Sequence, residues 1–160
     1  MAVSDQIKNT IGRALGRMPS GEYILTSQGA AGPVAMLASW AQQAGFEPPA
    51  VSVAVARGRP MGAAIRSSGK MALSILAQAD TTLMRHFARG TDDALSAVKL
   101  LDRPTGAPVL AEALAYLDCA LLSVCDFGGD HEIFIARVEG GDLLREGPAF
   151  THQRGNGFHY

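Results

Sequence analysis

Two arginines stand where a predicted strand ends and a predicted helix begins, in the run Arg57-Gly58-Arg59-Pro60. Proline is common in the first turn of a helix, so the pattern predicts a helix over 60–68, starting directly after the second arginine. The free N–H groups of a helix start, its positive dipole end and two guanidinium groups would together bind a phosphate. The alternative is that both arginines are simply solvated surface residues.

The strand before this corner carries bulky and small side chains on opposite faces. Because side chains alternate along a strand, Val51, Val53 and Val55 share one face of the predicted strand 50–56. That face would point to the core, and a face of small residues leaves room for a flat ligand close to the backbone. Close packing against a helix is the alternative. The stretch 36–60 is therefore interpreted as a cradle for a flat, anionic cofactor. The small face consists of Ala50, Ser52, Ala54 and Ala56.

No motif of the common hydrolases or P-loop enzymes occurs. The chain has no GxSxG, HExxH or Walker A sequence, and its four histidines lack metal-ligand spacing. Its two cysteines, Cys119 and Cys125, lie in an apolar run and are interpreted as buried free thiols. We therefore expect neither a hydrolase nor a zinc enzyme, and no bound metal.

Composition places the chain among globular proteins. Of its 160 residues, 48% are hydrophobic and 18% charged, which suits one domain with a substantial core. The formal net charge of −1 gives no reason to expect nucleic acid or an anionic membrane as a partner. The sequence has no apolar run long enough to span a membrane and no secretion signal, so we expect a cytoplasmic protein.

Short helices are expected at two further places. A lead-in helix over about 3–18 would be capped by Ser4 and would pack through one apolar edge, because apolar residues recur every four positions. A helix over 80–89 would have Asp80 as its cap. The edge of the lead-in helix consists of Ile7, Ile11 and Leu15.

The rest of the pattern predicts strands joined in hairpins. Glu139 to Asp142 is predicted to close a further hairpin, whereas 40–46 receives no assignment. Five or six strands with short helices predict an antiparallel barrel or sandwich over about 20–146, followed by a tail over 147–160. The strands are expected at 22–27, 34–39, 50–56, 71–76, 115–124 and 131–138, with turns at 28–33 and 125–130.

Several blocks of the chain resemble, in their order, the flavin reductase-like family of FMN-binding split barrels. They are EYILTS, MLASW, FEPPAVSVAVARGRP, MALSIL, LMRHF and GDHEIFIARVEGGDLL, and the resemblance extends from about Ala14 to Tyr160. More narrowly, MLASW with Gln43, LAYLDCALLS and the terminal HQRGNGFHY are similar to the C-terminal module of cyanobacterial flavodiiron proteins. No metallo-lactamase or flavodoxin module precedes them here, so an excised module or a stand-alone relative is expected.

The resemblance implies a mainly β fold with short helices, an antiparallel six-stranded FMN-binding split β-barrel of the Greek-key type. It also implies a homodimer in which FMN, in preference to FAD, lies near the subunit interface and is reduced by NAD(P)H. A flavodiiron-type or other redox partner would take the electrons. Where this chain has Leu37 and Gln43, many relatives have other residues, which leaves open whether FMN is held tightly or exchanges.

The resemblance also assigns site residues. In the first segment, Ala38 is small enough for a close backbone approach, Ser39 offers a hydroxyl, and Trp40 either stacks on the flavin or belongs to the core. In the second segment, Arg57 and Arg59 are the candidates for the phosphate. The implied cofactor-binding residues are Met36, Leu37, Ala38, Ser39, Trp40, Gln43, Ala54, Val55, Ala56, Arg57, Gly58 and Arg59, and His131 is the implied nicotinamide contact.

These observations lead to three hypotheses. The first is an FMN-dependent NAD(P)H oxidoreductase, in which hydride passes from the nicotinamide to flavin N5 and electrons pass on to an acceptor. The second is a component that reduces free flavin for a monooxygenase. The third is a non-catalytic flavin-binding module that relays electrons from a protein donor in an O2- or NO-reducing system.

Overall fold

Most of the chain forms β-strands. The structure, a computed structural model, describes residues 4–103, 106–153 and 155. The final residues of the block HQRGNGFHY, including Tyr160, lie outside this description. The strands are β1 (Ser20–Gly21), β2 (Tyr23–Gly29), β3 (Gly32–Ala38), β4 (Ala41–Phe46), β5 (Pro49–Ala56), β6 (Lys70–Ile75), β7 (Ala115–Cys125), β8 (His131–Leu143) and β9 (Thr151–His152).

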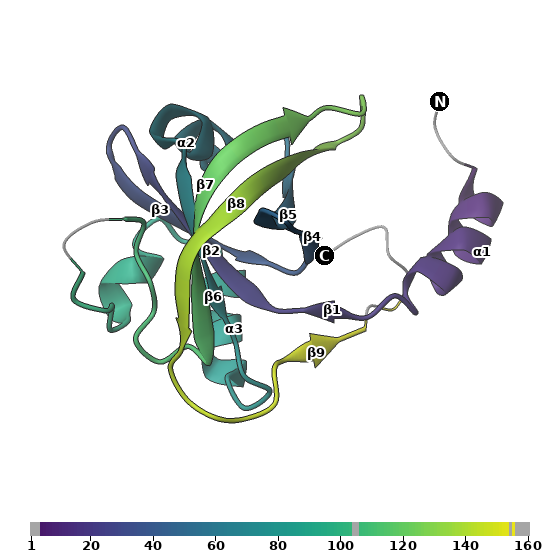
Figure 1. Ribbon diagram of the computed structural model, residues 1–160. Helices are drawn as coiled ribbons and strands as arrows, with labels where there is room; N and C mark the ends of the chain where they lie inside the picture. The colour runs from purple at the N-terminus through teal and green to yellow at the C-terminus, as the bar shows by residue number, and fades with distance from the viewer. Residues whose placement is uncertain (1–3, 104–105, 154, 156–160) are drawn as a thin grey trace.

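Seven strands form one antiparallel sheet in the order β3-β2-β6-β7-β8-β5-β4 (Figure 1). β6, β7 and β8 form a meander and β5 lies beside β8, which is a Greek-key arrangement. Within the described residues no ladder joins the two end strands, β3 and β4, so the barrel is split. The predicted mainly β, antiparallel split-barrel fold is confirmed.

The sheet has seven strands where six were expected, and β4 accounts for the difference. Its sequence is rich in Ala, Gln and Gly, which have little intrinsic preference for strands. It is a strand because β5 supplies its hydrogen-bonding partners, from Ala41 opposite Val53 to Phe46 opposite Pro49. Pairing within this hairpin therefore outweighs the low strand propensity of β4.

The inner faces of the sheet enclose the main core. Phe134 and Val53 are fully buried there, together with Leu25 from β2 and Met71 from β6. A second, smaller core lies between β2, β3 and the helix α3 (Thr81–Ala88), around Phe87. The two cores together fix the strand ends that carry the candidate site.

The helix α2 (Pro60–Ser68) agrees with its prediction. It begins at a proline and ends at Gly69, whose φ of 67° lies in the left-handed region that favours glycine. The cap predicted for α3 has a different role, because the Asp80 carboxylate accepts a hydrogen bond from the Ala77 amide at 2.7 Å and pairs with Arg145. It makes no capping bond to α3.

The lead-in helix α1 (Asp5–Leu15) forms as predicted, and Ser4 accepts a hydrogen bond from the Ile7 amide at 3.4 Å. Its predicted packing is not seen. Figure 1 shows α1 standing away from the barrel, and Ile7, Ile11 and Leu15 are 48%, 45% and 39% exposed. Helical periodicity therefore located the helix correctly, but its apolar edge is left partly exposed by the described residues.

The predicted turn at 125–130 is confirmed between β7 and β8, whereas the predicted turn at 139–142 is wrong. β8 continues through that segment to Leu143, with an irregular register opposite Asp118 and Cys119. A Cβ at Gly141 would lie 2.4 Å from the Tyr116 carbonyl oxygen, so this glycine permits close approach of β7. The glycines here serve a bulged strand and not a hairpin.

Two other expectations about the chain have mixed outcomes. Cys119 is buried, and burial raises the pKa of its thiol to about 12, but Cys125 is exposed at the end of β7. Part of the predicted tail is a strand, because β9 pairs with β1 through Ser20 and His152. None of the described helices has the length and apolar character needed to cross a membrane.

Candidate functional site

Three of the four small side chains of β5 face outward, as its alternation predicts, whereas Ala50 is buried at 8% exposure. Val51, Val53 and Val55 are 6%, 0% and 1% exposed and belong to the main core. The residues of the opposite face, from Ser52 to Ala56, are only half-buried. Close packing against a helix would bury this face, so its partial exposure favours the interpretation as a shallow, flat surface.

Trp40 and His131 meet beside this surface. The Ala54 amide donates a hydrogen bond to the Trp40 carbonyl oxygen at 2.9 Å, and His131 is paired with Ala56 across β5 and β8. The two rings lie with centroids 4.9 Å apart at 50°. Trp40 is 38% exposed, so it is not a core tryptophan. Its indole forms a wall at the end of the small-residue face.

The imidazole of His131 is held from a second side. Its Nδ1 lies 3.0 Å from a carboxylate oxygen of Asp130, and the residue is 7% exposed. The hydrogen bond from His131 lowers the pKa of Asp130, which therefore stays ionised at neutral pH. A histidine fixed between a carboxylate and an indole has a defined orientation at the mouth of the site.

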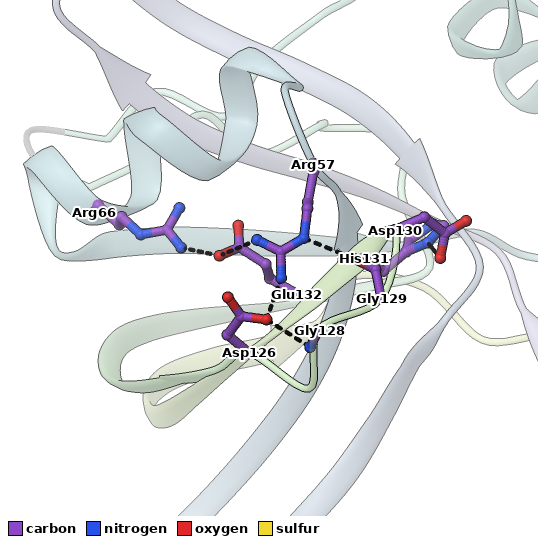
Figure 2. A network of polar contacts seen from close by, with 8 residues as sticks. All are labelled: Arg57, Arg66, Asp126, Gly128, Gly129, Asp130, His131 and Glu132. Carbon is purple, nitrogen blue, oxygen red and sulfur yellow. Dashed lines mark hydrogen bonds and ion pairs between the residues drawn. The ribbon is translucent and has the colours of Figure 1, made fainter. Parts of the chain in front are cut away.

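The two predicted phosphate ligands have different surroundings. The Arg57 guanidinium is engaged by the chain itself, with Asp126, Glu132 and the Gly129 carbonyl oxygen around it (Figure 2). Arg59 is exposed at the N-cap of α2, and within the described chain its side chain makes no ion pair or hydrogen bond. Between them Gly58 has a φ of 78°, which a side chain would disfavour.

The side chains of the first predicted segment mostly face inward. Ala38 and Met36 face the main core, while Leu37 packs into the second core. Ser39 is buried, at 5% exposure. Of this segment, only Trp40 is shown to reach the outward surface near His131.

Gln43 lies apart from the other predicted residues. It lines a cavity of about 330 Å³ between β4, β5 and the inner face of the sheet, which none of the other predicted site residues lines. The register explains this, because Gln43 is opposite Val51 whereas the site gathers near Ala54 and Ala56. The structure therefore brings together Trp40, Ala54, Ala56, Arg57 and His131, and separates Gln43 from them.

The carboxylates of the β7–β8 turn were not predicted as site residues. Asp126, Asp130 and Glu132 flank the turn, and each contacts a predicted residue. The signal available in the sequence was the density of acidic residues on both sides of Gly128-Gly129, directly before His131. Chemically, the site combines a shallow apolar surface, an aromatic wall, an oriented imidazole and, in Arg59, a guanidinium with no ion pair to the described residues, which suits a flat ligand with an anionic group.

Comparison with known proteins is consistent with this chemistry. Residues 15–157 match the family described as "Flavin reductase like domain". "Putative diflavin flavoprotein A 1" from Thermosynechococcus vestitus is 39% identical over 153 residues, covering 92% of this chain and 27% of the relative. "Diflavin flavoprotein A 1" from Synechocystis is 36% identical over 153 residues, covering 92% and 26%. The chain thus spans about a quarter of the length of these relatives.

Solved structures give the same picture of the fold. The Streptomyces globisporus NADH:FAD oxidoreductase SgcE6, in complex with NAD and FAD fragments, has a TM-score of 0.83 and 26% identity, covering 98% of this chain and 94% of that one. The flavin reductase PheA2 has a TM-score of 0.81 and 24% identity, covering 96% of each chain, and supports the fold alone.

Proposed function

The chain belongs to the flavin reductase-like family, and from that premise we propose that it is an FMN-dependent oxidoreductase that takes hydride from NAD(P)H. The observation that carries the proposal is the Trp40–His131 pair at the end of the half-exposed, small-residue face of β5. When bound, the flavin would supply the hydride-accepting chemistry. The chain's own residues would bind it, orient it and position the nicotinamide.

The outward face of β5 fits a flat ring system. Ala54 and Ala56 have no side chain beyond Cβ, so a planar ligand can lie against the backbone. Trp40 would cover one edge of the ring, and its neighbour Ser39 would supply a backbone polar group. In this arrangement the strand-end residues hold the ring, and none of them has to move.

The phosphate is best placed at the start of α2. Arg59 is exposed there, beside the first-turn amides of a helix whose N-cap has no side-chain hydrogen bond. Those amides, the helix dipole and the Arg59 guanidinium would all stabilise a doubly charged phosphate bound there. FMN carries one such group at the end of its ribityl chain, at a distance from its ring.

His131 would contact the nicotinamide nucleotide. It opens β8 next to Trp40, and Asp130 fixes its ring through Nδ1. A fixed imidazole can orient an amide or phosphate of the incoming nucleotide, which raises the fraction of encounters with productive geometry. This role requires no proton transfer by the side chain.

The spectrum of the purified protein tests the proposal. Apoprotein titrated with FMN, FAD and riboflavin should quench flavin fluorescence with the lowest Kd for FMN. Anaerobic mixing of the complex with NADH or NADPH should then bleach the flavin absorbance. Protein that binds none of the three flavins would contradict the proposal, whereas bleaching by only one nucleotide would identify the co-substrate.

A second candidate function comes from the relatives. The chain is 39% identical to a diflavin flavoprotein of which it spans 27%, so it aligns with one part of a longer flavoprotein. In this case the bound flavin would receive electrons from another protein and relay them to a flavodiiron-type partner. Flavin that stays oxidised with both nucleotides, but is reduced by a protein donor, would favour the relay.

We also propose that the chain forms a homodimer through its uncovered apolar surfaces. Ile133 and Ile135 lie on the outward face of β8 opposite Ala54 and Ser52, and Leu122 on β7 is 49% exposed. The apolar edge of α1 adds a second such surface. A second copy would cover the flavin and remove this apolar area from water.

The mass in solution tests the homodimer. Light scattering after size-exclusion chromatography should give twice the chain mass of 16.8 kDa. A stable monomer that still binds FMN would show that the partner copy is not needed to cover the flavin.

A further inference from the structure

We propose that Arg57 is a positioning residue, which holds the β7–β8 turn and through it His131, and that it does not bind the flavin phosphate. The proposal rests on the proposed function, because it concerns how the same site is kept in order. It separates two arginines that the sequence presents as a pair, only two positions apart.

The contacts of Arg57 all lead to one segment. Its amide donates to the Asp130 carbonyl oxygen at 2.9 Å and its Nε donates to the Gly129 carbonyl oxygen at 2.7 Å. Its Nη2 donates to a carboxylate oxygen of Asp126, and its Nη1 lies 3.4 Å from Glu132. Figure 2 shows the guanidinium lying between these groups. Each of the three guanidinium nitrogens of Arg57 therefore already has a partner.

The turn is itself ordered around the same carboxylate. Asp126 Oδ1 accepts from the Gly128 amide at 2.7 Å as well as from Arg57. The Gly128 amide first, and Arg57 second, lower the pKa of Asp126, so the carboxylate stays charged at neutral pH. One guanidinium and one carboxylate thus close the turn between its two strands.

The Arg57 side chain holds the turn through Gly129 and Asp126, and the main chain of residue 57 adds a bond to Asp130, the last residue of the turn. Asp130 accepts from the Arg57 amide through its carbonyl oxygen and pairs with His131 Nδ1 through its carboxylate. His131 is the first residue of β8 and meets Trp40 at 4.9 Å. A displacement of the turn would therefore displace the imidazole from the indole.

The charges around Arg57 oppose a phosphate there. Asp126 and Glu132 both pair with its guanidinium, and Glu132 is also held by Arg66 at 2.6 Å. A phosphate at this position would approach two carboxylates and would have to replace existing contacts. Arg59 has no such partners within the described chain, so phosphate binding falls to Arg59 and the start of α2.

Comparing FMN with riboflavin, which lacks the phosphate, tests the assignment. We expect Arg59→Ala to raise the Kd for FMN at least about tenfold, as loss of one charge-assisted contact would, and to leave the Kd for riboflavin unchanged. Arg57→Ala should leave the ratio of the two Kd values as in the wild type. A selective loss of FMN affinity in Arg57→Ala would overturn the proposal.

The rate of flavin reduction tests the positioning role. In Arg57→Ala, stopped-flow reduction of the saturated complex by the preferred nucleotide should slow at least about tenfold, because the imidazole is no longer held in place. His131→Ala should slow the same step. In the double variant Arg57→Ala/His131→Ala the rate of reduction should equal that of His131→Ala, since both substitutions remove the same contribution, that of the oriented imidazole.

Two results would overturn the positioning role, namely an unchanged rate in Arg57→Ala or additive losses in the double variant. The variant Asp126→Asn tests the same contact with little risk of misfolding. The Asp126 side chain is 56% exposed, and this substitution leaves the Arg57 guanidinium in place. Asp126→Asn should also slow flavin reduction, while the melting temperature and the ratio of the Kd values for FMN and riboflavin stay unchanged. Wild-type protein that binds no flavin would instead refute the proposed function.

Discussion

Replacing Ala54 with tryptophan should weaken flavin binding by a factor on the order of 100, which corresponds to about 2.7 kcal/mol. Ala54 lies at the centre of the outward face of β5, and its amide is bonded to the Trp40 carbonyl oxygen. An indole at this position would occupy the flat space that the ring needs, and overfilling a shaped site costs more than the added contacts return. Fluorescence titration of Ala54→Trp with FMN measures the change.

The matched control is Ala120→Trp, the same substitution on the outward side of β7. Ala120 is half-buried and lies opposite Lys70 and Arg137. Arg137 is six residues along β8 from His131, a separation of about 20 Å in a strand. The control should therefore keep the wild-type Kd. Equal affinity in Ala54→Trp and the wild type would show that the flavin does not lie on this face.

Replacing Phe134 with alanine should lower the free energy of unfolding by about 3–5 kcal/mol, the range for emptying a buried aromatic site. Phe134 is fully buried in the main core and is packed against α2, where a Cβ at Gly62 would lie 3.4 Å from its ring. Arg66 lies over the same ring at 5.0 Å. Urea denaturation followed by circular dichroism measures the loss.

Phe46 provides the control for this prediction, because it is the same residue type at 86% exposure on β4. Phe46→Ala should change the free energy of unfolding by no more than about 0.5 kcal/mol. Similar losses in the two variants would mean that Phe134 does not lie in the main core, and the placement of β8 would then need revision.

Local sequence patterns determined much of the fold. The proline before α2 and the glycine after it located that helix, and the alternation around Val53 gave both the strand β5 and its two faces. The glycines at 128–129 located the turn before His131. These features depend on neighbours within a few residues, where backbone preference and side-chain periodicity act directly.

The sequence by itself therefore determined the strand end, the small face and the arginine pair, while only the tertiary structure decided which residues meet there. Trp40 contacts His131, and Arg57 finds Asp126, across separations that no local pattern encodes. β4 was missed for another reason, because its composition disfavours a strand and only its pairing with β5 makes it one. Arg57 and Arg59 are chemically identical and lie two positions apart in the sequence. Their roles differ because the folded chain places carboxylates around Arg57 and leaves Arg59 at the start of a helix. The physical reason is that the energy between two charges depends on their distance in space and not on their separation in the sequence.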